Sequence, residues 1–189
     1  MCTRCHWVDL TKPDYVEYHD KEWGVPVHDD KTMFEFLVLE SAQAGLSWYT
    51  ILKRRSGYRS AFANFNAELV AEFTEQDVEK LMQDTGIIRN RAKIEAAINN
   101  ARRFLEIQQE FGSFCSYIWG FVDNKVQVNS INSSEDYVAT SDVSDKLAKD
   151  MKKRGFKFLG STTLYAHLQA TGLINDHLNT CYRKTEVAG

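Results

Sequence analysis

The sequence predicts an all-α protein, and three observations lead to this fold class. Apolar residues recur at helical spacing in several segments, as at Phe34, Leu37 and Val38. Glycines and residues that commonly cap helices mark where these segments end and begin. No stretch of useful length alternates between apolar and polar residues, and there is no internal repeat. We therefore expect helices joined by short loops.

The first 30 residues show no clear periodicity, but they contain both prolines and many aromatic, Cys and His residues. Helical patterns begin after them. Asp29 or Asp30 is the expected N-cap of a first helix, which ends at Gly45. Further helical segments are expected over residues 49–55, stopping near Gly57, and over residues 58–65 and 67–73.

The second half of the chain has clearer helix boundaries. Residues 74–77 resemble a capping box for a helix that reaches Asp84, with Gly86 as its C′ residue. Residues 125–128 can form an extended segment that is too short to imply a sheet, and residues 130–142 are expected to form a loop. The remaining helices are expected over residues 91–109 and 114–122, from Asp142 or Ser144 to Gly155, and from Ser161 or Thr162 to Gly172.

The length and composition indicate a globular protein of one domain. The chain has 189 residues, of which 43% are hydrophobic and 12% aromatic, so we expect residues 1–189 to form a single domain and a monomer. The apolar runs fall far short of the roughly 20 residues that a membrane span needs. The N-terminus has no apolar signal region. These features predict a cytoplasmic protein without a membrane partner.

Glu40 does not fit a plain core helix. It lies one turn after Phe36 and Leu37, so its carboxylate leaves the helix beside apolar side chains. A buried carboxylate is costly unless it has a partner. Two interpretations follow. Glu40 is either a surface acid or internal ion-pair partner, as is common, or a functional group beside the irregular turn after Gly45.

The segment from Asp84 to Lys93 predicts a phosphate-binding hairpin. A glycine turn followed by a helix N-terminus presents unpaired backbone N–H groups, which favour an anion. The net charge of −3 gives no global argument for nucleic acid, and an ordinary helical connection can contain the same residues. Ile88 would anchor the hairpin in the core. The side-chain cations at the hairpin are Arg89, Arg91 and Lys93.

Four residues from the two ends of the chain suit a metal site. His177 and Cys181 have i, i+4 spacing, so a helix over residues 176–182 would place both on one face. Cys5 and His19 complete a set of two cysteines and two histidines, which suits a closed tetrahedral zinc site. Such a zinc would be structural.

This zinc would join the N-terminal segment 1–30 to the C-terminal tail 173–185. Other ligand sets remain open, because Cys2 and Cys5 form a C-x-x-C pair, and His6 and His28 are weaker rivals. Scattered Cys and His residues of the core or surface would give the same pattern without a metal.

Several motifs, in order along nearly the whole chain, closely resemble the DNA-3-methyladenine glycosylase I family. They are Cys5-His-Trp7, Tyr18-His-Asp20, Glu22-Trp-Gly-Val-Pro26, Leu39-Glu40, Gln43-Ala-Gly-Leu-Ser-Trp48, Gly86-Ile-Ile-Arg89, Lys152-Lys-Arg-Gly-Phe-Lys-Phe158 and Asn175-Asp-His177.

The resemblance implies the helix-hairpin-helix DNA glycosylase fold, a bound zinc and excision of 3-methyladenine from alkylated double-stranded DNA, with the free base as product. It implies that Glu40 is the catalytic, base-reading residue, and that Cys5, His19, His177 and Cys181 hold the zinc. The walls of the base pocket are expected from Trp7, Tyr15, Tyr18, Trp23 and Trp48. DNA contacts are expected from Leu46, Gly86, Ile88, Arg89, Arg91 and Lys93.

The expected mechanism relies on binding. The damaged nucleotide must be flipped out of the duplex, and its cationic base both leaves easily and suits an anionic, aromatic pocket. Residues 86–122 contain no aspartate, so we expect no dedicated general base. No lysine is placed to form a Schiff base, so the enzyme should not cleave the strand.

Two other functions compete with this one. A non-catalytic, zinc-stabilised helix-hairpin-helix protein that binds damaged DNA would use the same hairpin and basic residues. A zinc hydrolase fits less well, because four protein ligands leave the metal no open position for water.

Overall fold

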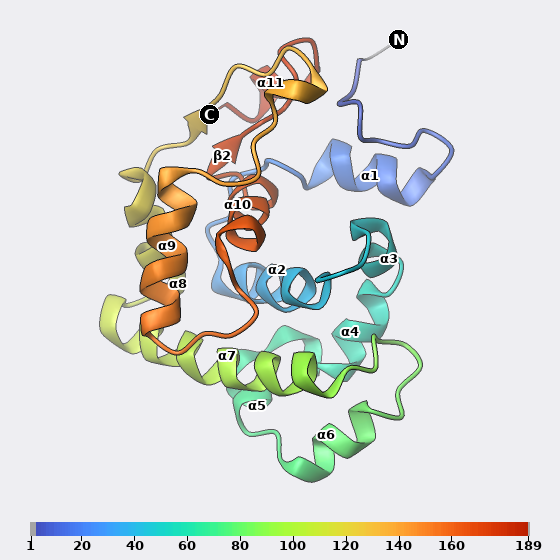
Figure 1. Ribbon diagram of the computed structural model, residues 1–189, viewed down its shortest axis with the longest axis vertical. Coiled ribbons are helices and arrows are strands. Elements are labelled where there is room, and N and C mark those ends of the chain that lie inside the picture. Colours follow the sequence, from blue (N-terminus) through green and yellow to red (C-terminus); the bar gives the residue numbers. More distant parts are fainter. Residues whose placement is uncertain (1–2, 189) are drawn as a thin grey trace.

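Helix α2 (Asp30–Ala42) lies at the centre of the molecule, with helices from both halves of the chain around it (Figure 1). The computed structural model describes residues 3–188. Residues Met33 to Ala42 of α2 are all buried, and the helix packs against α3, α7, α8 and α10. Asp29 is its N-cap, with its side chain accepting a hydrogen bond from the Thr32 N–H at 2.8 Å. The all-α fold class is confirmed.

One side of α2 is covered by a run of mostly short helices and by the long helix α7, which crosses the molecule below it in Figure 1. Asn90 caps α7, and Gly112, with a φ of 83°, ends it. α7 packs against α5, α6, α8 and α2. In chain order this part contains α3 (Trp48–Leu52), α4 (Arg55–Ala61), η1 (Ala63–Phe65), α5 (Ala67–Ala71), α6 (Glu75–Leu81) and α7 (Arg91–Phe111).

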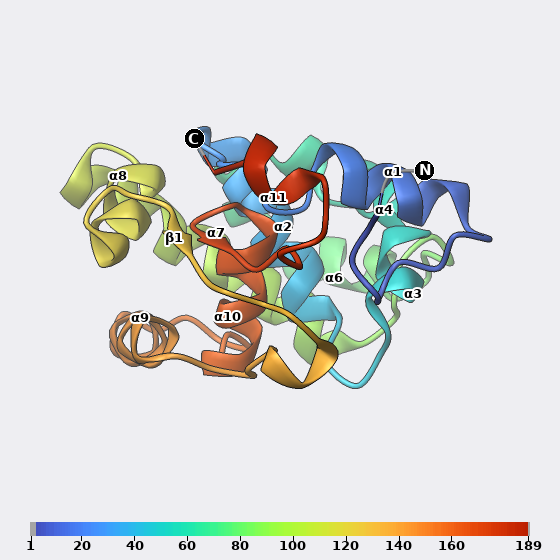
Figure 2. The ribbon, with the colours of Figure 1, turned by 90° about the horizontal axis from the view of Figure 1, so that it is seen from above.

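The other side of α2 is covered by α10, which packs in turn against α9. Figure 2 shows α9 and α10 side by side at one edge of the molecule and α1 at the opposite edge. Two short parallel strands pair Gln127 with Ile174. The remaining elements of the described chain are α1 (Pro13–Lys21), α8 (Phe114–Trp119), η2 (Gly120–Val122), β1 (Gln127–Val128), η3 (Ser134–Asp136), α9 (Asp142–Lys153), α10 (Ser161–Ala170), β2 (Ile174–Asn175) and α11 (Arg183–Glu186).

A second, smaller core joins the two ends of the described chain. It is separate from the main core around α2 and α7, and it lies where the N-terminal segment, α1 and the chain after β2 meet. Burying apolar side chains from both ends in one cluster holds these segments together. Its buried members are Cys5, Val8, Tyr18, Trp23, Phe36, Ile131, Ala170, Leu178 and Cys181.

Several expected boundaries were wrong. Helix α1 was not predicted, because it begins at Pro13 without a side-chain cap. α6 ends at Leu81 and not at Asp84, so Gly86 is not its C′ residue. Gly57 lies inside α4 and ends no helix. Residues 176–182 are irregular and contain no helix.

Within residues 3–188, no helix has both the length and the apolar character that a bilayer crossing requires.

Candidate active site and metal centre

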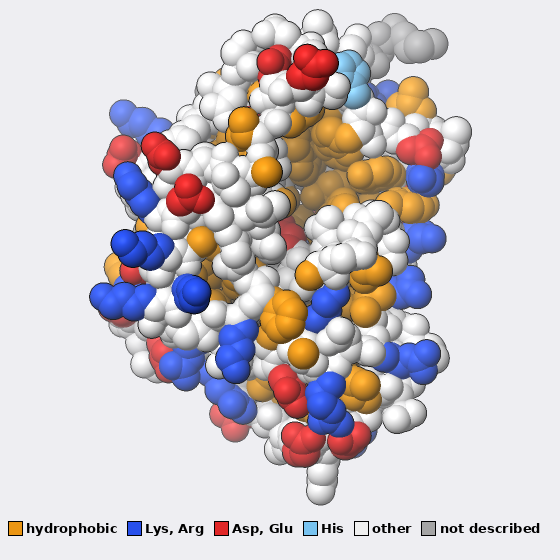
Figure 3. Space-filling view, in the orientation of Figure 1, with side chains coloured by type: hydrophobic (Ala, Val, Ile, Leu, Met, Phe, Trp, Pro, Cys, Tyr) orange, Lys and Arg blue, Asp and Glu red, His pale blue; other side chains and the backbone are white. Residues whose placement is uncertain are grey.

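A pocket of about 560 Å³ opens between α1, α2, α3 and α10. In the space-filling view it is a hollow walled by hydrophobic side chains, with an acidic side chain visible at its floor (Figure 3). Glu40 is the acid among the residues that line it. The described residues around the pocket are His6, Trp7, Tyr15, Tyr18, Trp23, Glu40, Gln43, Trp48, Ser134, Tyr137, Val138, Ala166, Gln169 and Ala170.

The carboxylate of Glu40 is buried at the floor of this pocket. Its Oε2 atom lies 2.7 Å from Nδ1 of His167, which is also fully buried. Its Oε1 atom is buried and has no hydrogen-bond partner among the described residues. Burial raises the pKa of Glu40, while the charge and hydrogen bond of His167 lower it. One oxygen of Glu40 is therefore fixed by His167, and the other can accept a further hydrogen bond.

Aromatic rings form the walls. Trp48 stacks on Phe36 with an angle of 17° between the rings, and its centroid lies 5.6 Å from that of Tyr18. Trp7 and Trp23 meet edge to face at 4.9 Å. Burial raises the pKa of Tyr18 well above its usual value, so its hydroxyl stays neutral. Such walls suit a flat, electron-poor ring.

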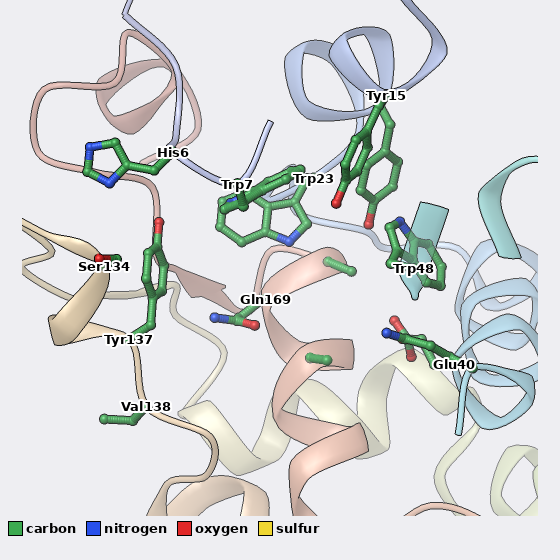
Figure 4. A pocket seen from close by; sticks show the side chains of 14 residues that line it. His6, Trp7, Tyr15, Trp23, Glu40, Trp48, Ser134, Tyr137, Val138 and Gln169 are labelled. Carbon is green, nitrogen blue, oxygen red and sulfur yellow. The ribbon is translucent and has the colours of Figure 1, made fainter. Parts of the chain in front are cut away.

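The structure brings the five predicted wall residues and Glu40 together around this cavity. Figure 4 shows Tyr15, Trp48 and Glu40 on one side, Trp7 and Trp23 in the middle, and Tyr137 with Val138 on the opposite side. The opposite wall was not predicted, because it comes from residues 130–142, which carry no periodic pattern. His167 was also missed. It is a single histidine on a buried helix, and no local signal connects it to Glu40.

The predicted hairpin lies between α6 and α7 and is fixed to α4. The Ile88 N–H donates to the hydroxyl of Tyr58 at 3.2 Å, and the Gly86 N–H donates to Asp84 at 2.7 Å. A Cβ on Gly57 would lie 2.3 Å from the Gly86 carbonyl oxygen, which explains why glycine stands inside α4. The hairpin is therefore held close to the backbone of α4.

The three hairpin cations differ in their surroundings. Arg91 forms ion pairs with Glu75, Glu79 and Glu95. Lys93 donates from Nζ to the carbonyl oxygens of Ala42 at 2.9 Å and Ala44 at 2.6 Å. Arg89 is exposed and has no ion pair within the described chain.

These contacts change the expectation for the hairpin. Of the three cations, Arg89 has no ion pair in the described chain, whereas Arg91 is paired with glutamates and Lys93 binds backbone carbonyls. Lys93 holds the turn that follows α2, and Leu46 in that turn is 38% exposed. The first turn of α7 is thus hydrogen-bonded to the end of α2, the helix that carries Glu40.

Four buried side chains from the two ends of the chain form a cluster that can hold a metal ion. Cys5, His19, His177 and Cys181 have ligand atoms that all lie within 4.8 Å of one another. The Sγ atom of Cys5 lies 3.4 Å from Nδ1 of His177, and the Sγ atom of Cys181 lies 3.5 Å from Nε2 of His19. Tetrahedral bonding to one ion would separate sulfur from nitrogen by about 3.6 Å. The spacing therefore fits.

The outer nitrogens of both histidines also fit a metal site. Nδ1 of His19 is hydrogen-bonded to the carboxylate of Asp20 at 2.8 Å, and Nε2 of His177 is hydrogen-bonded to the Trp23 carbonyl oxygen at 3.0 Å. These bonds leave the other ring nitrogens with lone pairs facing the cluster. The Cys5 thiol donates toward Cys181, which lowers the pKa of Cys181 and raises that of Cys5. Cys2, the rival ligand, lies outside the described residues.

The fold and site together define a class. A helical hairpin with a free arginine stands beside an aromatic pocket with a carboxylate at its floor, and these features are typical of proteins that take a flipped base from DNA. The sequence profile of the methyladenine glycosylase family matches residues 7–184. The chain belongs to this family.

Individual relatives agree with this assignment. The chain is 48% identical over 178 residues to DNA-3-methyladenine glycosylase 1 of Escherichia coli, covering 94% of this chain and 95% of that protein. It is 45% identical to DNA-3-methyladenine glycosylase of Haemophilus influenzae, covering 98% and 100%. It is also similar to a solved variant of 3-methyladenine DNA glycosylase I in complex with 3-methyladenine, with a TM-score of 0.93, 40% identity and coverage of 96% and 97%.

Proposed function

We propose that this protein is a DNA repair hydrolase that removes 3-methyladenine from alkylated double-stranded DNA by hydrolysing the N-glycosidic bond. One observation carries the proposal. An unpaired oxygen of a buried glutamate, Glu40, lies at the floor of an aromatic pocket. A buried acceptor without a partner is costly. A flat base that donates a hydrogen bond and carries positive charge would satisfy it.

Binding the base would supply the energy for extrusion. Flipping a nucleotide out of the duplex costs a few kcal/mol, and less for a damaged base. Trp48 offers a face for stacking, and the edges of Trp7 and Trp23 lie across the same cavity. The Oε1 atom of Glu40 would accept a hydrogen bond from the purine. Unmodified adenine is neutral, so it would leave the carboxylate poorly compensated.

The chemical step would depend on the base as a leaving group. Methylation at N3 makes the attached base cationic, so the base departs as neutral 3-methyladenine with the electron pair of the glycosidic bond, and a water molecule bonds to the sugar carbon and releases a proton to solvent. We assign no general base, and Glu40 would act by binding the flipped base in its pocket, where the methylated base is already a good leaving group. No lysine lines the pocket in the described chain, so we expect no covalent sugar intermediate and no strand cleavage.

The hairpin would hold the DNA. The N-terminus of α7 and the exposed Arg89 can contact phosphates, and Gly86 allows the backbone to approach them. Ile88 would anchor the hairpin, and Leu46 would contact the duplex beside the flipped nucleotide. We expect a monomer to bind one double-stranded site, in the cytoplasm.

We further propose that the metal is zinc. Two thiolates and two imidazoles are its preferred structural ligands, and the burial of all four side chains agrees with a closed site. Cys5, His19, His177 and Cys181 would hold it, and it would join segment 1–30 to the tail 173–185 within a single domain. When bound, zinc supplies structural cross-linking, and the residues of the pocket perform the binding and release of the base.

Release of free base tests the function. Methylated duplex DNA is incubated with the protein, and the released bases are separated by chromatography. We expect 3-methyladenine to be released with a stoichiometry above one per protein. Tight binding to methylated duplex without any release would instead identify a non-catalytic damage-binding protein. Cleaved strands in the absence of heat or alkali would contradict the absence of lyase chemistry.

A further inference from the structure

Glu40 contacts a second buried polar group, His167 of α10. His167 is 0% exposed and donates from Nδ1 to Oε2 of Glu40 at 2.7 Å, but it is not among the residues that line the pocket. The two residues come from α10 and α2, which pack against each other. His167 therefore reaches a bound base only through Glu40.

The surroundings of His167 leave Glu40 as its side-chain partner. Its Nε2 atom is buried and has no hydrogen-bond partner among the described residues. Within the described chain, the ring is therefore held by one side-chain hydrogen bond, from Nδ1 to Oε2 of Glu40.

A glutamate side chain without such a donor would be free to rotate. Glu40 has three rotatable side-chain bonds, and its Oε1 atom has no partner that would fix the carboxylate. Tyr18 of α1 is the other described titratable group that interacts electrostatically with Glu40, and its pKa is raised by burial, so it adds no charge. Lys93 reaches the end of α2 but binds backbone carbonyls there.

We propose that His167 is a positioning residue for base recognition: its hydrogen bond to Oε2 holds Glu40 in one orientation, with Oε1 toward the base. This inference rests on the proposed function and adds a residue to it. It assigns the recognition group as a buried histidine–glutamate pair in which the histidine touches no substrate.

The test compares three proteins. His167→Leu removes the donor and replaces the imidazole ring with an apolar side chain of similar size. His167→Asn keeps an amide donor near the position of Nδ1. Thr171→Val is the control, because Thr171 lies just after α10 and donates to the His167 carbonyl at 2.6 Å, so its loss removes a different buried hydrogen bond. The dissociation constant of free 3-methyladenine is measured against pH, and melting temperature is recorded for each protein.

The expected result follows from the sign of the interaction. His167 lowers the pKa of Glu40, so its removal lets that pKa rise further. The affinity of His167→Leu should fall about tenfold at neutral pH, and its loss at acid pH should begin at a higher pH than in wild type. His167→Asn should stay within about threefold of wild type. Thr171→Val should change melting without moving the acid limb.

Two results would overturn the inference. One is an acid limb in folded His167→Leu that coincides with wild type, and the other is His167→Asn behaving like His167→Leu. If the leucine variant does not fold, His167→Gln replaces it, because its longer side chain carries the amide near Nε2 and away from Glu40. A wild-type protein that releases no 3-methyladenine would overturn the proposed function as well, whereas an active wild type with unmoved limbs overturns this inference alone.

Discussion

Gly57 of α4 and Gly86 of the hairpin meet backbone to backbone, with space for no side chain between them. A Cβ on Gly57 would lie 2.3 Å from the Gly86 carbonyl oxygen. The adjacent Tyr58 accepts a hydrogen bond from Ile88. The position of the hairpin is therefore set by its contact with α4.

Gly57→Ala should displace the hairpin. We expect duplex affinity to fall roughly tenfold and the protein to lose about 1–3 kcal/mol of stability through overpacking, while affinity for free 3-methyladenine stays within about threefold. Gly120→Ala is the matched control, because nothing lies within 4 Å of a Cβ at that helical glycine. Titration of undamaged duplex and urea unfolding measure the two effects. Equal duplex affinity for both variants would show that the hairpin tolerates displacement.

Arg89 and Arg91 should contribute differently to DNA binding. Arg89 has no ion pair in the described chain, whereas Arg91 is neutralised by three glutamates. Each lost phosphate contact removes about 0.9 from the slope of log affinity against log salt. Arg89→Ala should show this reduction, and Arg91→Ala should show much less. Salt titrations of duplex affinity decide it, and a larger change for Arg91 would reverse the assignment.

Glu40→Gln should weaken base binding without abolishing excision. The amide keeps the shape but loses the anion and presents a donor where the purine also has donors. Charged hydrogen bonds contribute about 1.5–3 kcal/mol, so affinity for free 3-methyladenine should fall roughly ten- to a hundredfold.

Trp48→Ala is the comparison for that variant, because it should lower base affinity through lost stacking, worth about 1–3 kcal/mol. Calorimetry gives both affinities, and single-turnover assays give excision. If Glu40→Gln abolished turnover while base affinity stayed intact, Glu40 would be a general base and the account based on binding would be wrong.

Removal of one metal ligand should lower stability more than it changes the pocket. Structural zinc contributes on the order of 10 kcal/mol in small domains, so Cys181→Ala should melt at a much lower temperature and contain less than one zinc per chain. Cys115→Ala is the control, because Cys115 is buried outside the cluster. Elemental analysis and thermal melting are the measurements. A zinc-free wild type, or equal melting of both variants, would contradict the proposed site.

The predictable part of the fold was encoded locally. Asp29, Asn90 and Ser141 cap helices with their side chains, and Gly112 and Gly155 follow helix ends with positive φ. Such signals depend on a few neighbouring residues, so they can be recognised in sequence. Helix α1 lacks a cap of this kind, and its buried residues Tyr18 and His19 face the pocket and metal cluster.

The unpredicted part depends on contacts between distant segments. In the sequence, Gly57 is typical of a helix end, and only the structure shows that it makes room for Gly86. Arg91 and Lys93 are equivalent as sequence-level candidates for phosphate binding, and only their partners in the structure distinguish them. The hydrogen bond between His167 and Glu40 joins residues 127 positions apart. No local sequence pattern at either residue indicates the other. His177 and Cys181 meet at the cluster through an irregular turn, although a helix was the reason for pairing them.

The hydrogen bonds from Lys93 to the carbonyl oxygens of Ala42 and Ala44 hold the first turn of α7 at a fixed distance from the end of α2. In the proposed function the first turn of α7 would face DNA, and it is hydrogen-bonded to the end of the helix that carries Glu40, so the distance between the DNA contact and the pocket would be set before DNA binds. Each docking would then inspect one nucleotide, and inspecting the next requires the protein to shift along the strand. We expect hydrogen exchange at the amides of residues 43–46 to change little when undamaged duplex binds. A large change would mean that the distance between α7 and the end of α2 is adjustable.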